Sequence, residues 1–115
     1  TRKSMNKLRT YKDGLLKSSY IERSEFEFLP KRNKNTRCTN LEKMQKCYLA
    51  GEARAEDNVI LLSQHTIWLR EHNRLARELS RINKHWDDET IFQQTRRIVI
   101  AEYQNIIYTE LLPLI

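Results

Sequence analysis

Glycine, proline and cysteine are scarce in this chain, which contains only two of each among its 115 residues. A fold built from many tight turns is therefore disfavoured, because such turns need glycine and proline, and long helices are favoured instead. Hydrophobic runs are also short. None approaches the ~20 residues that cross a bilayer, so no membrane span is expected in this segment. Thr1–Lys3 leads into polar residues rather than the apolar core of a signal peptide.

The basic charge is confined to the first part of the chain, whose formal net charge is +6 overall. Residues 1–46 carry 13 Lys/Arg against 5 Asp/Glu, whereas residues 47–115 carry 8 against 10. The basic residues lie in a region of weak periodicity, which favours a solvated loop region. A basic helical nucleic-acid binder is the alternative and predicts steep salt dependence. The net acidic helical half argues against it, so no nucleic acid is expected as a partner.

The two cysteines, Cys38 and Cys47, are nine residues apart. One disulfide can close a loop of that length, and two reduced thiols suit a cytosolic protein equally well. The spacing does not match a CxxC redox or zinc motif. The residue types alone therefore leave both states open.

An irregular first half and a helical second half are expected. Residues 1–57 contain loop signals such as Pro30 and the polar run 31–35, while Glu25–Leu29 alternates like a short strand. In residues 58–112 apolar side chains recur every three or four positions, which is typical of two long helices. The fold class expected is all-α, with a long antiparallel helix pair and an irregular N-terminal region. Two helices cannot cover such wide apolar faces, so further helices must complete the core.

Polar residues mark the ends of both expected helices. Asp57 or Asn58 can cap the first helix, and Asn83 can end it. Asp87 or Asp88 can cap the second helix, where negative charge also stabilises the helix dipole. The two helices are therefore expected to be joined by a short connection.

The first helix carries the histidines and most of the ion pairs. His65 and His72 are seven residues apart, which is roughly 10 Å along a helix axis. A helical zinc pair needs i,i+4 spacing, so these two are expected to be hydrogen-bonded core histidines, and no metal site is expected. Arg74 and Arg77 are each expected to pair with Glu78 on a solvated face.

Arg54 is the candidate catalytic residue. It lies before the first helix, in a short segment that opens at Gly51 and also contains Glu52, Glu56 and Asp57. A guanidinium near a helix N-terminus can stabilise charge that develops on a bound oxyanion or a leaving hydroxide. The alternative, favoured by the residues alone, is a loop arginine held in a salt bridge.

Three blocks of the sequence resemble a known family. Cys47–Arg54 reads CYLAGEAR and resembles the C-F-L-A-G-D-x-R block of animal haem peroxidases, the family of myeloperoxidase, thyroid peroxidase and peroxidasin. His65–Ala76 is similar to the family's H-T-x-x-x-R-E-H-N-R-x-A block, and Ile82–Asp87 to its L-N-P-x-W-D block. So many matches at fixed spacing are far more specific than one short motif. The resemblance implies that residues 1–115 are an internal part of a single haem peroxidase catalytic domain.

The resemblance also implies a function for several residues of a secreted, extracellular or granule enzyme. Arg54 falls on the family's distal-side arginine, which contacts the haem site and stabilises the leaving hydroxide as hydrogen peroxide is cleaved. A small donor, such as a halide, thiocyanate or a phenol, is then oxidised. Asp57 falls where the family has a glutamate esterified to haem, and Asn58 where myeloperoxidase has a sulfonium-forming methionine. Cys38 and Cys47 match a local disulfide of the family.

Other essential parts of the family's site fall outside residues 1–115. These are the distal histidine, the proximal histidine and a calcium loop, whereas His72 falls on a structural histidine. The segment alone is therefore expected to be inactive, and the full-length protein is expected to hold haem and calcium. The alternative is a catalytically inactive, peroxidase-like adhesion or extracellular-matrix protein, for which the aspartate at position 57 is the one local indication.

Overall fold

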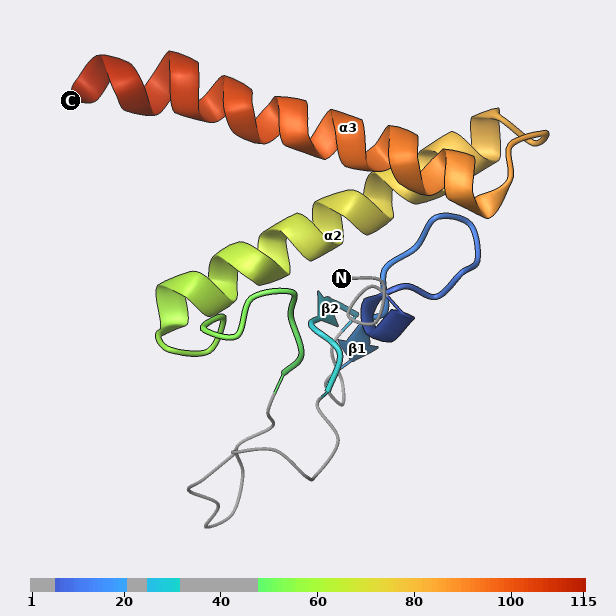
Figure 1. Ribbon diagram of the computed structural model, residues 1–115, viewed down its shortest axis with the longest axis horizontal. Coiled ribbons are helices and arrows are strands. Elements are labelled where there is room, and N and C mark those ends of the chain that lie inside the picture. Colours follow the sequence, from blue (N-terminus) through green and yellow to red (C-terminus); the bar gives the residue numbers. More distant parts are fainter. Residues whose placement is uncertain (1–5, 21–24, 32–47) are drawn as a thin grey trace, which may run out of the picture. The chain divides into compact units, whose positions relative to one another are not determined.

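The structure, a computed structural model, describes residues 6–20, 25–31 and 48–115. Two compact units share the chain, and helix α2 belongs partly to each of them. The first unit comprises Thr1–Arg9 and Leu16–Arg70, and the second comprises Thr10–Leu15 and Glu71–Ile115. Figure 1 labels the strands β1 (Ser19–Tyr20) and β2 (Glu27–Phe28) and the helices α2 (Val59–Ile82) and α3 (Asp88–Ile106). A π-helical turn (Ile107–Leu111) and a 3-10 turn (Leu112–Leu114) follow α3.

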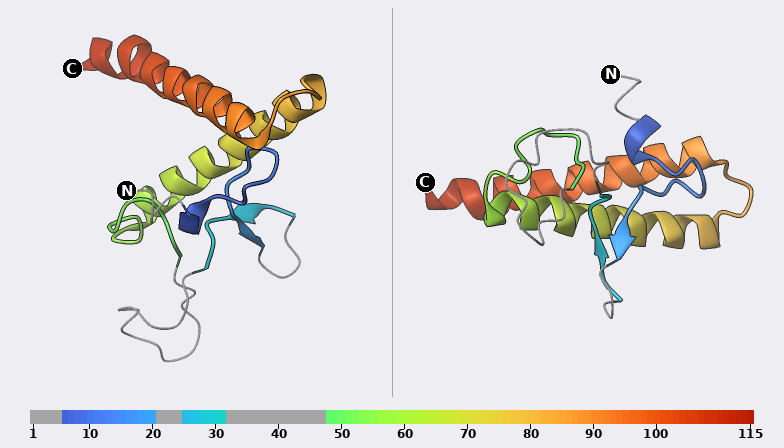
Figure 2. Two further views of the ribbon diagram at one scale, coloured as in Figure 1. Left: turned by 45° about the vertical axis from the view of Figure 1, so that its right-hand side comes forward. Right: turned by 90° about the horizontal axis from the view of Figure 1, so that it is seen from below.

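The described part of the chain is mostly helical, as expected from the sequence. Its strands are two residues long each and pair antiparallel, which confirms the short strand expected within residues 25–29. Figure 2 shows this small ladder in two further views. The all-α assignment is therefore correct. Neither of the long helices in the described residues combines the length and hydropathy of a membrane span.

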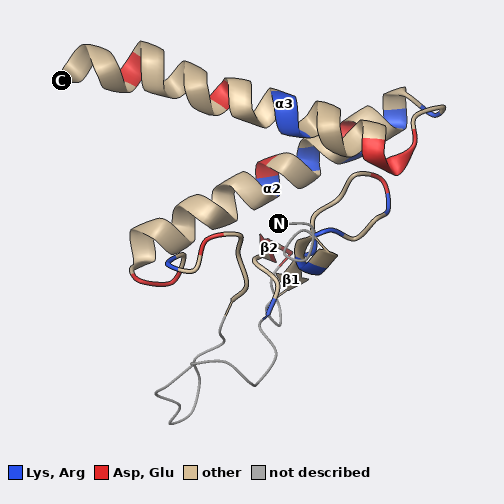
Figure 3. Ribbon diagram, viewed as in Figure 1, with Lys and Arg blue, Asp and Glu red and all other residues tan. Residues whose placement is uncertain are grey.

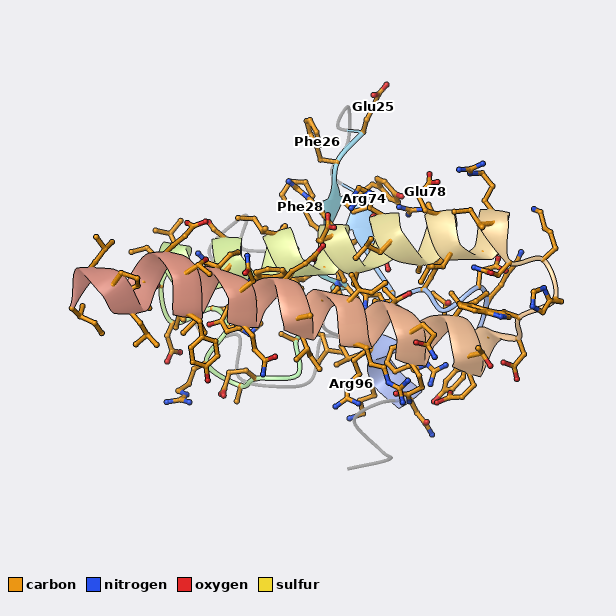
Figure 4. The ribbon with its side chains drawn as sticks, turned by 90° about the horizontal axis from the view of Figure 1, so that it is seen from above. Glu25, Phe26, Phe28, Arg74, Glu78 and Arg96 are labelled. Atoms are coloured by element: carbon orange, nitrogen blue, oxygen red, sulfur yellow. The ribbon has the colours of Figure 1, made fainter. Side chains whose placement is uncertain are left out.

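In the first unit, Arg70 of α2 contacts the β ladder through a hydrogen bond and two cation–π interactions. Its Nε donates a hydrogen bond to the carbonyl oxygen of Glu27 at 2.6 Å. Its guanidinium carbon lies 5.3 Å from the ring centroid of Phe26 and 5.0 Å from that of Phe28. Figure 4 shows these two phenylalanines following one another along the same arm. The hydrogen bond and the two cation–π contacts together fix this arm on the helix.

Helix α2 begins at its predicted cap and ends at its predicted stop. The Asn58 Oδ1 accepts a hydrogen bond from the backbone N–H of Leu61 at 2.9 Å, so Asn58 rather than Asp57 is the N-cap. The helix ends at Ile82, directly before Asn83. The expected apolar stripe is only partly covered, because Leu61 remains 37% exposed and Ile82 65% exposed. Within the described residues, the buried face of α2 consists of Thr66, Leu69, His72, Asn73 and Ala76.

In the second unit, helix α3 begins at Asp88, and the residue before it, Asp87, is the N-cap and one of the two caps predicted. The Asp87 Oδ1 accepts a hydrogen bond from the backbone N–H of Thr90 at 2.9 Å. Hydrogen bonding from the Thr90 side chain, and secondarily from its backbone N–H, lowers the pKa of Asp87. The connection returns the chain so that the second half of α2 and the start of α3 form a hairpin (Figure 1). The rings of His72 and Phe92 meet across this hairpin, with their centroids 5.4 Å apart.

The segment Thr10–Leu15 packs onto this hairpin through Gly14. The Gly14 N–H donates to the Asp88 Oδ1 at 2.7 Å, and the Gly14 carbonyl accepts from the His72 Nε2 at 3.0 Å. Because a carbonyl can only accept, His72 carries its proton on Nε2 in this contact. Gly14 has a positive φ of 67°, in the left-handed region that favours glycine. This short segment thereby joins the two helices of the second unit.

The ion pair of Arg74 on α2 differs from the one predicted. Arg74 binds Glu71 through two hydrogen bonds of 2.9 and 2.6 Å, and not Glu78; Arg74 and Glu78 are both labelled in Figure 4. Glu78 instead binds Arg81, with the Arg81 Nη2 2.8 Å from the Glu78 Oε2. The prediction of an Arg74–Glu78 pair was therefore wrong. Both observed pairs have i,i+3 spacing. On a helix, i,i+3 and i,i+4 neighbours lie at similar distances, so rotamers decide between them.

Candidate functional site

The turn in front of α2 holds the candidate site and lies within the first unit. Two backbone hydrogen bonds shape it, from the Ala55 N–H to the Glu52 carbonyl at 3.4 Å and from the Asp57 N–H to the Arg54 carbonyl at 3.0 Å. Ala55 is buried and anchors the turn, whereas the four acidic and basic residues around it are exposed. Figure 3 shows both signs of charge in this turn.

Arg54 forms a salt bridge and hydrogen bonds with Glu52, two positions before it. The Glu52 Oε1 accepts hydrogen bonds from the Arg54 backbone N–H at 3.1 Å and from its Nε at 3.2 Å. The Glu52 Oε2 accepts a third bond from the Arg54 Nη2, also at 3.2 Å. These bonds lower the pKa of Glu52 to about 2 and raise the pKa of Arg54. The loop arginine is therefore salt-bridged, as the residues alone had favoured, and it remains accessible, with 73% of its side chain exposed.

The two acidic residues that follow Arg54 have different surroundings. The Glu56 carboxylate accepts a hydrogen bond from the Tyr48 backbone N–H at 2.7 Å, which closes the turn onto the preceding strand-like segment. That segment is itself tied down, because the Leu49 N–H donates to the Pro30 carbonyl at 2.7 Å. Asp57 is exposed, and its negative charge contributes to the raised pKa of Arg54. Of the two carboxylates, Asp57 is thus the one that faces outward without anchoring the loop.

The first residues of α2 add an apolar surface next to this turn. Val59 is 75% exposed and Ile60 is 70% exposed, although both are large aliphatic residues. Such residues are usually covered in a folded domain. The turn and the helix start together present a cation, two carboxylates and an apolar patch over seven consecutive residues, 54–60.

The histidines belong to the framework. His72 is buried and bonded to Gly14, as predicted for a core residue. His65 is half-buried, and its Nδ1 lies 2.9 Å from the Leu61 carbonyl one turn earlier in the helix. Within residues 6–20, 25–31 and 48–115, no cluster of three or more metal-ligating side chains occurs. The predicted disulfide cannot be placed in this framework, because Cys38 and Cys47 both lie outside the described residues.

Glu52 is the residue whose role the sequence did not reveal. Three carboxylates surround Arg54 in the sequence, and the spacing does not show which of them binds it. A pattern of Glu and Arg two positions apart in a turn is the only signal, because a turn can bring a side chain back onto the N–H two residues later.

The chain is similar in sequence to known peroxidases. The model of the family described as animal haem peroxidase matches residues 1–115. The chain is 44% identical over 108 residues to the chorion peroxidase of Aedes aegypti, covering 94% of this chain and 13% of that protein. It is 51% identical over 69 residues to the lactoperoxidase of Mesocricetus auratus, covering 60% of this chain and 10% of that protein.

A solved structure extends the similarity to the fold. Peroxidase A from Dictyostelium discoideum aligns with a TM-score of 0.83 and 36% identity, covering 98% of this chain and 22% of that one. The chain thus spans between 10% and 22% of the length of these three relatives.

Proposed function

Because the chain belongs to the animal haem peroxidase family, we propose that the protein containing it is a haem-dependent peroxidase. It reduces hydrogen peroxide and oxidises a halide, thiocyanate or phenolic donor. The observation that carries this proposal is the exposed guanidinium of Arg54, held in a fixed turn at the N-terminus of α2. Preorganised donors of this kind contribute to catalysis when they face an oxygen on which negative charge develops.

The residues around Arg54 fit a haem group. A porphyrin presents a flat apolar surface with anionic substituents, and residues 54–60 offer a cation and two exposed aliphatic side chains, Val59 and Ile60. Haem, when bound, supplies the redox chemistry of the iron. Asp57 is the carboxylate proposed to contact or bond its edge. Aspartate is one methylene shorter than the glutamate at the corresponding family position.

The chemical role proposed for Arg54 is charge stabilisation. Its guanidinium donates hydrogen bonds to the peroxide oxygen that leaves as hydroxide, and its permanent positive charge offsets the developing negative charge. The pKa of Arg54 is raised further by Glu52, so the group stays protonated throughout the reaction. Arg54 therefore acts as an electrostatic stabiliser and does not itself transfer the proton.

The remaining proposals concern the intact protein. Calcium is proposed to bind a segment beyond residues 1–115, and a secreted, extracellular or granule location is proposed from the family resemblance. A Cys38–Cys47 disulfide would suit such an oxidising location. Hydrogen peroxide and a small reducing substrate are the proposed partners, with no nucleic acid.

Turnover of the full-length protein tests the proposal against the inactive adhesion or matrix alternative. The purified haem-loaded protein is expected to oxidise a phenol only when hydrogen peroxide is added, and stopped-flow absorption spectra are expected to change on mixing with peroxide alone. A full-length protein that binds haem but leaves peroxide unconsumed would establish the inactive alternative instead.

Replacing Asp57 with alanine in the full-length protein should weaken haem retention roughly tenfold, the effect of losing one hydrogen bond to a charged group. Transfer of haem to an excess of apomyoglobin measures this loss. Asp57→Glu restores the longer carboxylate and should raise the fraction of haem that survives acid–acetone extraction. Glu78→Ala is the control, because Glu78 is an exposed carboxylate paired with Arg81. Equal haem transfer from wild type and Asp57→Ala would remove Asp57 from the haem site.

A further inference from the structure

We infer that Glu52 is a positioning residue that fixes the orientation of Arg54 and aims one edge of its guanidinium at the peroxide. This inference rests on the proposed function of Arg54. It concerns a different residue, which contributes no group of its own to the reacting atoms.

The geometry of the Glu52–Arg54 salt bridge defines which edge of the Arg54 guanidinium is bound to Glu52. Nε and Nη2 both bond to the Glu52 carboxylate, one to each oxygen. These two nitrogens form the side edge of the guanidinium fork, which matches a carboxylate in bidentate fashion. The remaining N–H groups, on Nη1 and on the outer side of Nη2, consequently point away from Glu52. Among the described residues, no other acceptor bonds to this guanidinium.

The Glu52–Arg54 salt bridge differs from an ordinary surface ion pair. Exposed pairs usually contribute little, because two long side chains lose entropy when they are held together. Here the same carboxylate also accepts the backbone N–H of Arg54 at 3.1 Å, so a single residue fixes both the main chain and the side chain of Arg54. The turn is also held by the Ala55–Glu52 and Tyr48–Glu56 bonds. The hydrogen bonds of Glu52 therefore couple the backbone at the start of this turn to the orientation of the Arg54 guanidinium.

The charge of Glu52 has a second consequence. It compensates the positive charge of Arg54, so the pair is neutral as a whole while its outer edge still donates hydrogen bonds. Hydrogen peroxide is neutral when it binds, so its binding depends on the oriented donors, whereas the binding of a small anion would gain from an uncompensated cation. Glu52 should therefore lower the affinity of the site for small anions while it favours peroxide cleavage.

Two substitutions in the full-length, haem-loaded protein test this role. Glu52→Gln removes the charge and one arm of the bidentate contact, and should slow the reaction with peroxide roughly tenfold, as expected when a catalytic group loses its orientation. It should also bind fluoride roughly fivefold more tightly, measured by absorption titration, because the charge of Arg54 is then uncompensated. Glu52→Asp keeps the charge and should recover most of the peroxide rate and the weak fluoride affinity.

Glu71→Gln is the matched control, because Glu71 holds Arg74 in the same two-bond fork on α2. It should leave both measurements unchanged. Crystal structures of full-length wild type and Glu52→Gln provide a readout without activity, and should show the Arg54 guanidinium rotated only in the variant. The inference is overturned if Arg54 keeps its orientation in Glu52→Gln, or if the peroxide rate and the fluoride affinity both match wild type. A wild-type protein that does not consume peroxide, while Arg54 still rotates in the variant, would instead refute the proposed function.

Discussion

Replacing Arg54 with alanine in the full-length protein is expected to slow its reaction with hydrogen peroxide by about 100- to 1000-fold, the usual effect of removing one preorganised oxyanion donor. The truncation removes the donors and the charge that stabilise the leaving hydroxide. Stopped-flow measurement of the bimolecular rate with peroxide isolates this step from oxidation of the donor substrate. Because the pKa of Glu52 is lowered to about 2, the pair keeps its charges above a pH of about 4. The rate difference should therefore not change with pH above that value.

Arg81→Ala is the matched control for this measurement. Arg81 is also an exposed arginine in a salt bridge, with 68% of its side chain accessible and its Nη2 2.8 Å from Glu78. It lies in the last turn of α2, within the second unit. Arg81→Ala should leave the peroxide rate within experimental error of wild type. Equal rates for Arg54→Ala and wild type would remove Arg54 from the chemistry, even if the protein is a peroxidase.

The second large effect is expected from Gly14→Ala, which should destabilise the hairpin of α2 and α3 by about 2–5 kcal/mol. A Cβ at this position would lie 2.6 Å from the Ile91 Cγ2 and 2.8 Å from the Phe92 backbone nitrogen. The backbone nitrogen cannot move aside without disturbing α3. The positive φ of 67° adds strain for any residue with a side chain. Relief by displacement of the segment would break the Gly14 hydrogen bonds to Asp88 and His72.

Thermal unfolding of the full-length protein, together with hydrogen exchange of the α3 amides, measures this loss. Gly51→Ala is the matched control, because a Cβ there would meet only the Leu8 Cδ1 at an ordinary contact distance of 3.8 Å. Surface substitutions of that kind usually change stability by no more than about 0.5 kcal/mol. The close approach of this segment to the helix would be contradicted if Gly14→Ala had the same unfolding midpoint as wild type and the same protection of the α3 amides from hydrogen exchange.

Local features of the fold could be read from the sequence because they depend on neighbours in the chain. Asn58 and Asp87 cap their helices as predicted, since a cap needs only a polar side chain and the N–H groups two or three residues later. Arg54 could be selected because the block around it has a specific spacing. The ion pair of Arg74 was predicted wrongly, since Glu71 and Glu78 are both within reach on a helix surface and their rotamers decide.

The sequence by itself determined the helical class, the helix ends, the position of Arg54 and the family. These follow from periodicity, capping chemistry and matched blocks, which are properties of short stretches. The structure was also needed to show that Glu52, rather than Glu56 or Asp57, binds Arg54, because side-chain rotamers decide among three nearby carboxylates. Only the tertiary structure decided that Gly14 meets two partners, His72 and Asp88, which are 58 and 74 positions away. The physical reason is that periodicity specifies which face of a helix is buried but not what covers it. Contacts between distant segments depend on how the chain closes in space.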